Sequence, residues 1–413
     1  MAFRRKLLLF ILFIFSSFSY AADCEGPRHH IFLLHGIGGD RGSFGFLPEV
    51  LSRENSCKRV RTFEYKTGSE QNTYQFAHDF HLFMTSFPAS ELRSFDKISL
   101  IMHSQGGLVG TLWLKYLVET NHPLKNQLDS FITLSTPFWG ADIANIGKRF
   151  FYTLPEGVEN PISPFGRNEL NEMSYGSFTI RDLARNIESI FKDVPKIRPL
   201  VLSGLKKVHN SILGEDDMVV PTHSMRLEHF YLNDSINLAE KPSVVPASSF
   251  TKTEPKPFVI IPADHIKITQ PGIAKIPKTC LKNCNHPSLK HIVNHLKGMP
   301  VKQEKKYDIE RFRVNVLINN PLKLNLDDKD LRITIHGLDK ETKVPWIEPF
   351  RPGFGNAKLE RGPSFSFTGI AKRKGTQTLF VTLKYKNKNV KTYEVPVESG
   401  YSSFIDMTLA ELY

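Results

Sequence analysis

Long apolar runs, C-x-x-C pairs and internal repeats are all missing from this chain of 413 residues. A membrane-spanning helix needs about 20 apolar residues in a row, and the strongest apolar run, residues 7–18, is too short. The four cysteines lack the spacing of a zinc site, and we find no nucleic-acid-binding motif. With 40% hydrophobic and 23% charged residues, the composition is that of a globular protein.

The first 21 residues have the organisation of a secretory signal peptide. Residues 4–6 form a basic start, residues 7–18 form an apolar core, and residues 19–21 offer a cleavage site. An uncleaved membrane anchor is the alternative. We therefore expect an exported protein, periplasmic or secreted, whose mature chain begins near residue 22.

Export affects how the cysteines are interpreted, because disulfides persist in oxidising compartments. Cys24 and Cys57 each precede a predicted strand. If these strands are adjacent and parallel, both cysteines lie at the same end of the sheet, and a Cys24–Cys57 disulfide is favoured. Cys280 and Cys284 would then pair with each other. Free buried cysteines are the alternative.

The formal net charge is +12, and twelve minus the three charges of residues 4–6 leaves +9 for the mature chain. Excess positive charge favours anionic surfaces such as phospholipid headgroups. Because the charge is spread along the chain, an ordinary solvated surface is the simpler interpretation. An anionic membrane is thus a candidate partner, nucleic acid is not expected, and the oligomeric state is left open.

Between residues 29 and 298, short apolar segments alternate with helical stretches. The predicted strands are HIFLLHG (30–36), RVRTFEY (59–65), KISLIMHS (97–104), SFITLSTP (130–137), RPLVLSG (198–204) and PFVIIPADH (257–265). Such a pattern indicates a parallel sheet with helices on both faces. We expect a doubly wound α/β domain over residues 22–300.

Two regions depart from this alternation. Residues 140–195 are too long for a simple connection, and we predict a mostly helical cap insertion over one end of the sheet. Residues 241–257, rich in Pro, Ser and Thr, are predicted to form a loop. From residue 305 to residue 413, segments alternate apolar and polar side chains at period two, which predicts a small antiparallel β-sandwich. Its predicted strands are 311–318, 331–338, 364–371, 378–386, 391–398 and 403–409.

The segment IMHSQGG (101–107) joins a predicted strand to a predicted helix. A serine held on a sharp strand-to-helix turn usually occurs as G-x-S-x-G. Here Ser104 and Gly106 fit the pattern, whereas Met102 occupies the position of the first glycine. A plain turn is the alternative. If the segment is a serine elbow, Ser104 is a candidate nucleophile.

The segment HGIGG (35–39), after the first strand, offers a partner for this serine. Acyl transfer builds negative charge on the carbonyl oxygen, and backbone N–H groups can stabilise it. We predict the N–H groups of Ile37 and Gln105 as the two oxyanion donors. An ordinary glycine-containing turn is the alternative.

An acid and a base follow at two further strand ends. The segment GEDDMVVP (214–221) supplies Asp217, with Asp216 as second choice, and PADHIKI (262–268) supplies His265. A solvated acidic turn and a structural histidine are the alternatives. The order Ser104, Asp217, His265 is that of α/β-hydrolases, and carboxyl ends of strands are where open α/β sheets place ligands.

Residues 29–298 resemble the lipase and esterase branch of the α/β-hydrolases. The resemblance rests on LLHGIGGD, IMHSQGGLVG, LSTPFWGAD, GEDDMVVP and PADHIKI, in that order, with Met218 where the family commonly has glycine. Secreted bacterial lipases and the lipases similar to GPI inositol-deacylases are the nearest relatives it suggests. The resemblance implies hydrolysis of a carboxylic ester through an acyl-enzyme, without a metal or organic cofactor. It does not reach the C-terminal β domain.

The substrate is indicated only by aromatic and apolar side chains in and beside the insertion. These are Phe138, Trp139, Phe150, Phe151, Tyr152, Leu154, Phe165 and Phe178. They suit an acyl chain or a membrane surface, or they pack the insertion onto the core. We predict a lipid acyl ester. A thioesterase or amidase with the same triad, and a catalytically idle binding protein, are the alternatives, since a fold does not fix the reaction.

Overall fold

The computed structural model describes most of the chain. The described residues are 24, 26–54, 57–68, 71–141, 144, 166–206, 216–269, 286–303, 306–319, 331–337, 364–371 and 374–410. The predicted signal peptide, the Cys280–Cys284 pair and much of the predicted cap insertion lie outside these residues.

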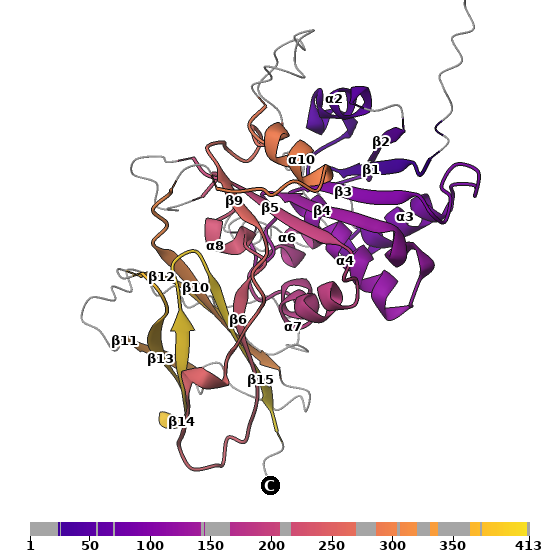
Figure 1. Cartoon of the computed structure of the whole chain (residues 1–413). Coiled ribbons are helices and arrows are strands. Elements are labelled where there is room, and N and C mark those ends of the chain that lie inside the picture. The colour runs from indigo at the N-terminus through magenta and orange to yellow at the C-terminus, as the bar shows by residue number, and fades with distance from the viewer. Residues whose placement is uncertain are drawn as a thin grey trace, which may run out of the picture.

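A six-stranded sheet forms the centre of the first domain, in the order β2-β1-β3-β4-β5-β9 (Figure 1). The strands are β1 (His29–Leu34), β2 (Lys58–Phe63), β3 (Lys97–His103), β4 (Leu128–Leu134), β5 (Arg198–Gly204) and β9 (Phe258–Ile261). Every neighbouring pair is parallel. All six predicted strands, and the parallel α/β sheet, are confirmed.

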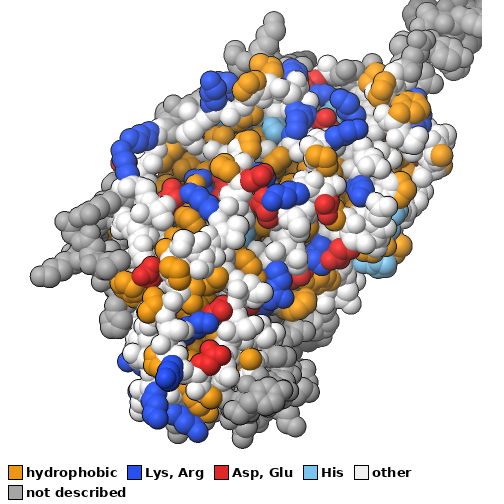
Figure 2. All heavy atoms as spheres, turned by 60° about the horizontal axis from the view of Figure 1, so that its bottom comes forward, with side chains coloured by type: hydrophobic (Ala, Val, Ile, Leu, Met, Phe, Trp, Pro, Cys, Tyr) orange, Lys and Arg blue, Asp and Glu red, His pale blue; other side chains and the backbone are white. Residues whose placement is uncertain are grey.

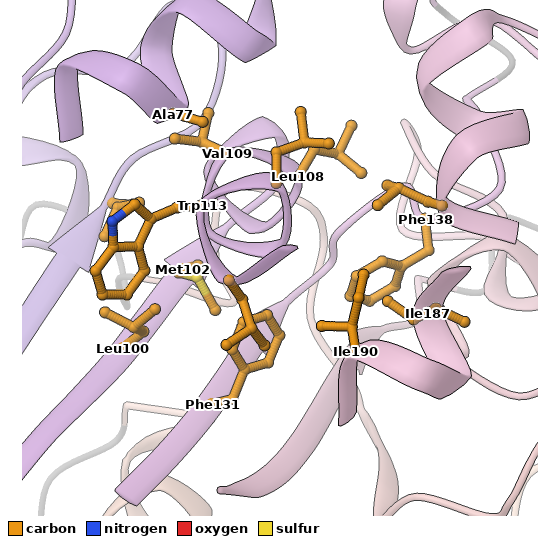
Figure 3. Packing of buried hydrophobic residues seen from close by; sticks show 14 of the residues in the cluster. Ala77, Leu100, Met102, Leu108, Val109, Trp113, Phe131, Phe138, Ile187 and Ile190 are labelled. Atoms are coloured by element: carbon orange, nitrogen blue, oxygen red, sulfur yellow. The ribbon is translucent and has the colours of Figure 1, made fainter. Parts of the chain in front are cut away.

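Helices cover both faces of this sheet because successive strand residues point to opposite sides. The helices are α2 (Leu47–Arg53), α3 (Thr73–Thr85), α4 (Gln105–Glu119), α6 (Arg167–Glu172), α7 (Phe178–Lys192), α8 (Thr222–Met225) and α10 (Leu289–Leu296). Short 3₁₀ turns occur at η1 (Arg41–Phe44), η2 (Pro123–Gln127) and η3 (Ala247–Ser249). In β1, Phe32 packs with α3, α4 and α7, whereas Ile31 packs with α2 and α10. Figure 3 shows part of the first of these two cores.

Helix α7 corrects part of the cap prediction. Its apolar side belongs to the core beneath the sheet, and the rings of Phe191 and Phe131 of β4 meet edge to face at 5.4 Å. Residues 178–192 are therefore a sheet-covering helix rather than a cap. Phe138 and Trp139 are fully buried, while Phe178 is 51% exposed.

Two further sheets form the C-terminal region, in the orders β12-β10-β15-β6-β8 and β11-β13-β14-β7. Their strands are β6 (His229–Ile236), β7 (Ser243–Val245), β8 (Thr251–Lys252), β10 (Arg311–Asn319), β11 (Leu331–Gly337), β12 (Ser364–Ile370), β13 (Gln377–Tyr385), β14 (Lys388–Val397) and β15 (Ser402–Leu409). Buried apolar residues from both sheets form one shared core. All six predicted C-terminal strands are present.

The sandwich differs from the prediction in two respects. Strands β6, β7 and β8 come from residues 229–252, which lie before the predicted boundary at 300–305, and two of them fall in the segment predicted as a loop. The pairs β10–β15, β15–β6 and β14–β7 are parallel, so the sandwich is mixed rather than antiparallel. Strands β7 and β8 are short edge strands, where nearby prolines are tolerated.

Polar and aromatic contacts join the sandwich to the first domain. The buried carboxylate of Asp406 in β15 pairs with Arg185 of α7, and within its own sheet it also accepts a hydrogen bond from Tyr231 of β6, 2.9 Å away. The indole of Trp139 lies 5.3 Å from the ring of Phe404. Without residues 305–413 these groups would be uncovered, because one partner of each contact would be lost.

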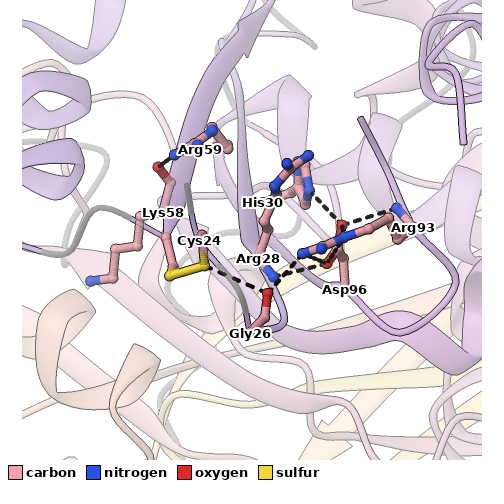
Figure 4. The surroundings of a disulfide bond; sticks show 9 residues. Cys24, Gly26, Arg28, His30, Lys58, Arg59, Arg93 and Asp96 are labelled. Atoms are coloured by element: carbon pink, nitrogen blue, oxygen red, sulfur yellow. Dashed lines mark hydrogen bonds and ion pairs between the residues drawn. A yellow bond between two sulfur atoms is a disulfide. The ribbon is translucent and has the colours of Figure 1, made fainter. Parts of the chain in front are cut away.

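The predicted Cys24–Cys57 disulfide is present, with the two Cα atoms 5.2 Å apart (Figure 4). Beside it, Asp96 is almost fully buried. Burial alone would raise the pKa of Asp96, but hydrogen bonds from Arg93, the Arg28 N–H and His30 lower it to about 2. The disulfide and this ionic group together connect the segments that precede β1, β2 and β3.

Surface charge is mixed on the face that Figure 2 draws. Lys and Arg side chains are distributed over it among Asp, Glu and hydrophobic side chains. On that face the excess positive charge is therefore spread out, as expected for a solvated surface. Within the described ranges, none of the helices has the length and apolar character needed to cross a bilayer.

Candidate active site

Ser104 stands on a strained turn between β3 and α4. Its φ is 52° and its ψ −125°, a region that non-glycine residues rarely occupy. The N–H of Ser104 donates to the carbonyl of Leu134 at 2.9 Å, and its own carbonyl accepts from Gly107 N–H at 3.0 Å. The neighbouring chain thus holds the turn, which has the geometry expected of a serine elbow.

Helix α4 begins directly against the end of β1. A Cβ at Gly106 would lie 2.4 Å from the carbonyl oxygens of both Leu34 and His35. Only a glycine permits this approach, since those contacts are with backbone atoms. Gly106 is therefore required by the packing behind the turn, in agreement with the pattern around Ser104.

Met102 is accommodated by a second glycine on α4. Its side chain is fully buried in the core between β3 and the helices (Figure 3). A Cβ at Gly110 would lie 2.0 Å from its sulfur atom. The thioether thus occupies space that a side chain at residue 110 would need, and the turn at Ser104 forms without glycine at residue 102.

Ser104, His265 and Asp217 form a continuous chain of hydrogen bonds. His265 Nε2 lies 2.9 Å from Ser104 Oγ, and His265 Nδ1 lies 2.6 Å from Asp217 Oδ2. A carboxylate only accepts hydrogen bonds, so Nδ1 carries the ring proton and Nε2 is free to accept from the serine hydroxyl. The structure brings these three predicted residues together.

The turn after β5 distinguishes the two aspartates. Asp217 Oδ1 accepts from the N–H groups of Val219 and Val220 at 3.0 and 2.8 Å, which leaves Oδ2 directed at His265. Asp216 instead accepts from the N–H of Met218 at 2.8 Å. Asp217 is therefore the carboxylate that orients His265, and Asp216 stabilises the turn.

The residues predicted as oxyanion donors, Ile37 and Gln105, both lie next to Ser104. Gln105 is the first residue of α4, so its N–H has no partner within the helix. Ile37 lines the cavity beside Ser104, and the preceding Gly36 is so close that a Cβ there would lie 2.7 Å from Ser104 Cβ. The glycine loop and the start of α4 therefore both lie next to Ser104, where backbone N–H groups can stabilise an oxyanion.

His103 contacts the site but was not predicted from the sequence. Its Nε2 donates to the backbone carbonyl of His265 at 2.8 Å, and the two rings lie 4.7 Å apart. Burial, and to a smaller extent the nearby His265, lowers the pKa of His103 well below its usual value. A neutral His103 can thus fix the loop that carries His265. Its position next to Ser104 gave no indication of this contact.

A cavity of about 310 Å³ opens at Ser104 and His265. Beyond these two residues and the glycine loop, most of its wall is apolar. The apolar lining residues are Ile37, Pro137, Ala141, Leu170, Met173, Val219, Val220 and Ile266. Such a wall suits a hydrocarbon chain next to the hydroxyl. Among the described residues there is no group of side chains that could hold a metal ion.

Helix α6 forms one side of this cavity and is fixed by a buried acid. Leu170 and Met173 face the cavity, whereas the carboxylate of Glu169 accepts from the N–H groups of Gly68 and Gly166. Burial raises the pKa of Glu169 to about 6 despite these hydrogen bonds. The acid therefore connects α6 to the loop after β2 and keeps the apolar wall in place.

Comparison with known proteins agrees with this geometry. Residues 25–153 match a family described as "Putative serine esterase (DUF676)". Phospholipase PlaB from Legionella pneumophila has a similar structure, with 16% identity, a TM-score of 0.61 and 93% of each chain covered. The chain therefore has the α/β-hydrolase fold, and its residues 25–153 are similar to a family of serine esterases.

The likeness to PlaB extends over the C-terminal sheets of this chain, because it covers 93% of the chain. The mature form of lipase BlEst2 from Bacillus licheniformis is also similar, with 14% identity and a TM-score of 0.39, over 68% of this chain and 97% of its own. No curated protein matches the sequence.

Proposed function

We propose that this α/β-hydrolase is an exported serine hydrolase that cleaves carboxylic esters of lipids through an acyl-enzyme. The observation that carries the proposal is the hydrogen-bonded chain Ser104–His265–Asp217, which ends on a strained serine beside an apolar cavity. The same arrangement of nucleophile, base and orienting acid performs acyl transfer in unrelated folds.

In this mechanism Ser104 Oγ attacks the acyl carbon while His265 Nε2 takes the hydroxyl proton. The carbonyl oxygen becomes an oxyanion, and the N–H groups of Ile37 and Gln105 stabilise it. His265 then gives its proton to the leaving alcohol. A water molecule, deprotonated by His265, attacks the acyl-enzyme, and Ser104 recovers a proton as the acid leaves. Asp217 stabilises the imidazolium in both halves of the reaction.

The substrate class follows from the cavity beside Ser104. An acyl chain placed against its apolar wall would gain about 0.8 kcal/mol for each buried methylene. A long acyl chain is therefore favoured over an acetyl group. The Cys24–Cys57 disulfide supports export, because such bonds persist in oxidising compartments.

A fluorophosphonate probe tests the nucleophile. The wild-type protein should be labelled and should hydrolyse p-nitrophenyl esters, whereas Ser104→Ala should do neither and should keep its thermal stability. Ser43→Ala is a matched control, because Ser43 lines the same cavity but its hydroxyl accepts from Asp40 N–H. Labelling that survives in Ser104→Ala would show that another residue is the nucleophile.

A series of p-nitrophenyl esters from two to twelve carbons tests the substrate class. We expect kcat/KM to rise up to about eight carbons or more, because each added methylene is buried. Fastest turnover of the acetate would instead indicate an esterase for small esters.

A further inference from the structure

The loops that carry Asp217 and His265 lie side by side at the mouth of the cavity. The N–H of His265 donates to the Asp217 carbonyl at 2.9 Å, and the N–H of Lys206 donates to the Asp216 carbonyl at 2.9 Å. The residues next to these paired positions therefore lie near one another beside the catalytic acid and base. We call the side chains of Lys206, Met218, Ile266 and Lys267 the mouth rim.

Two members of the mouth rim are apolar and exposed. Ile266 is 66% exposed and Met218 is 48% exposed. Ile266 also lines the cavity, so the exposed apolar surface continues into the wall that receives the acyl chain. Met218 has a φ of 84°, where a side chain adds strain. An exposed methionine at such a position gains little from packing within the protein.

The other two members are exposed lysines. The side chains of Lys206 and Lys267 are 44% and 62% exposed, and each ammonium lies 3.5 Å from Asp264 Oδ2. Asp264 is a single carboxylate with a side chain only 14% exposed. Two cations thus share one largely buried anion, and the mouth rim presents two exposed ammonium groups beside its apolar side chains.

We propose that the mouth rim docks on an anionic lipid bilayer and brings the cavity to the membrane surface. Met218 and Ile266 enter the boundary between headgroups and acyl chains, and the two lysines contact anionic headgroups. Apolar side chains flanked by lysines are the combination that binds this boundary. The proposal rests on the proposed function, because it assigns the surface from which the lipid ester enters.

Binding to vesicles tests the proposal in the Ser104→Ala background, where the lipid is not consumed. The probe is phosphatidylcholine vesicles with about one third phosphatidylglycerol, measured by co-sedimentation at several salt concentrations. Lys206→Gln with Lys267→Gln should weaken binding about fivefold per lysine and reduce the salt dependence. Met218→Asn with Ile266→Ser should weaken binding tenfold or more, since asparagine tolerates the positive φ at residue 218.

The matched control variants replace residues of similar exposure elsewhere on the chain. Leu82→Ser with Val244→Ser removes apolar side chains that are 54% and 61% exposed. Lys192→Gln with Lys297→Gln removes lysines whose side chains are 61% and 53% exposed. These variants should bind vesicles as tightly as the parent. Equal losses in rim and control variants, or no loss in the rim variants, would overturn the proposal.

A second measurement separates this proposal from the proposed function. With the catalytic serine intact, Met218→Asn and the paired lysine variant should hydrolyse a soluble short ester at the wild-type rate. Both should lose turnover of phosphatidylglycerol vesicles in proportion to their loss of binding. Rim-dependent binding by a protein that hydrolyses no ester would refute the function but support the docking surface. Ester hydrolysis with rim-independent binding would do the reverse.

Discussion

Gly110→Ala tests how the chain forms a serine elbow with methionine at residue 102. The added methyl group would lie 2.0 Å from the sulfur of Met102, inside a fully buried part of the core. The two groups must therefore separate by more than an ångström. If the thioether occupies the space that the small residue on α4 leaves free, the cost of the substitution depends on the side chain at residue 102.

The expected free energies follow from two opposing terms. Overpacking a well-packed core costs about 1–3 kcal/mol, and replacing glycine by alanine within a helix gains about 1 kcal/mol. Gly110→Ala alone should therefore lower the free energy of unfolding by about 0–2 kcal/mol. Met102→Ala alone should lose about 2–5 kcal/mol, because it empties a core site. In the Met102→Ala background the clash is absent, so Gly110→Ala should stabilise by about 1 kcal/mol.

A double-mutant cycle measures this coupling. Urea unfolding of the four proteins gives each free energy, and the interaction between residues 102 and 110 should be about 1–3 kcal/mol. Turnover of a soluble ester, followed in the same samples, reports whether the elbow moves. A coupling below about 0.5 kcal/mol would refute the reasoning, because the thioether would then not lie against the backbone of residue 110.

Three further outcomes follow from other parts of the structure. Asp217→Asn should lower kcat on a soluble ester by roughly 10⁴-fold, because the tautomer of the imidazole is no longer fixed. Asp216→Asn should lower kcat far less. A larger loss in Asp216→Asn would show that Asp216, not Asp217, is the catalytic carboxylate. Replacing Cys24 and Cys57, which are 33 residues apart, by serine should lower the free energy of unfolding by about 4 kcal/mol, and a reductant should then destabilise only the wild type. The pKa of Glu169 is raised to about 6, so ionisation costs more in the folded state and the stability of the wild type falls as pH rises from about 4.5 to 6. The free energy of unfolding of Glu169→Gln, measured in urea, should therefore increase by about 2 kcal/mol relative to that of the wild type between pH 4 and 7. A difference that stays constant with pH would argue against a buried acid.

The positions of Ser104, Asp217 and His265 could be predicted because each follows a strand that the sequence marks clearly. In a parallel sheet the carboxyl ends of the strands meet at one edge, so three residues far apart in sequence are brought together by the topology alone. The order of the strands did not have to be known for this prediction. It required only that the apolar segments belong to one parallel sheet.

The contacts of His103 and Met102 could not be predicted in the same way. They depend on which direction a side chain takes from a strand end and on the size of a residue one helical turn further along. Met102 could be recognised as a departure from G-x-S-x-G, but its compensation by Gly110 is a property of packing between β3 and α4. No periodicity in the sequence reports such a pair.

The sandwich was predicted from alternation after residue 305, yet three of its strands precede that boundary. Strand β6 has polar residues such as Asn233 and Asp234 among its apolar ones, and β7 lies between prolines. Local signals there favour a loop or an edge. Pairing with β15 and β14 supplies the missing stability, and such long-range pairing overrides weak local preference.

This interleaving connects the sandwich to the candidate active site through a short stretch of chain. After the turn that carries Asp217, helix α8 leads directly into β6. The hydroxyl of Ser402 in β15 donates to the carbonyl of His223 in α8 at 3.1 Å, and Ser224 accepts from the N–H of Trp139. The C-terminal sheets therefore support the acid turn from behind. Their contribution to catalysis would be to hold Asp217 in place, because they lie against α8 rather than against the substrate cavity.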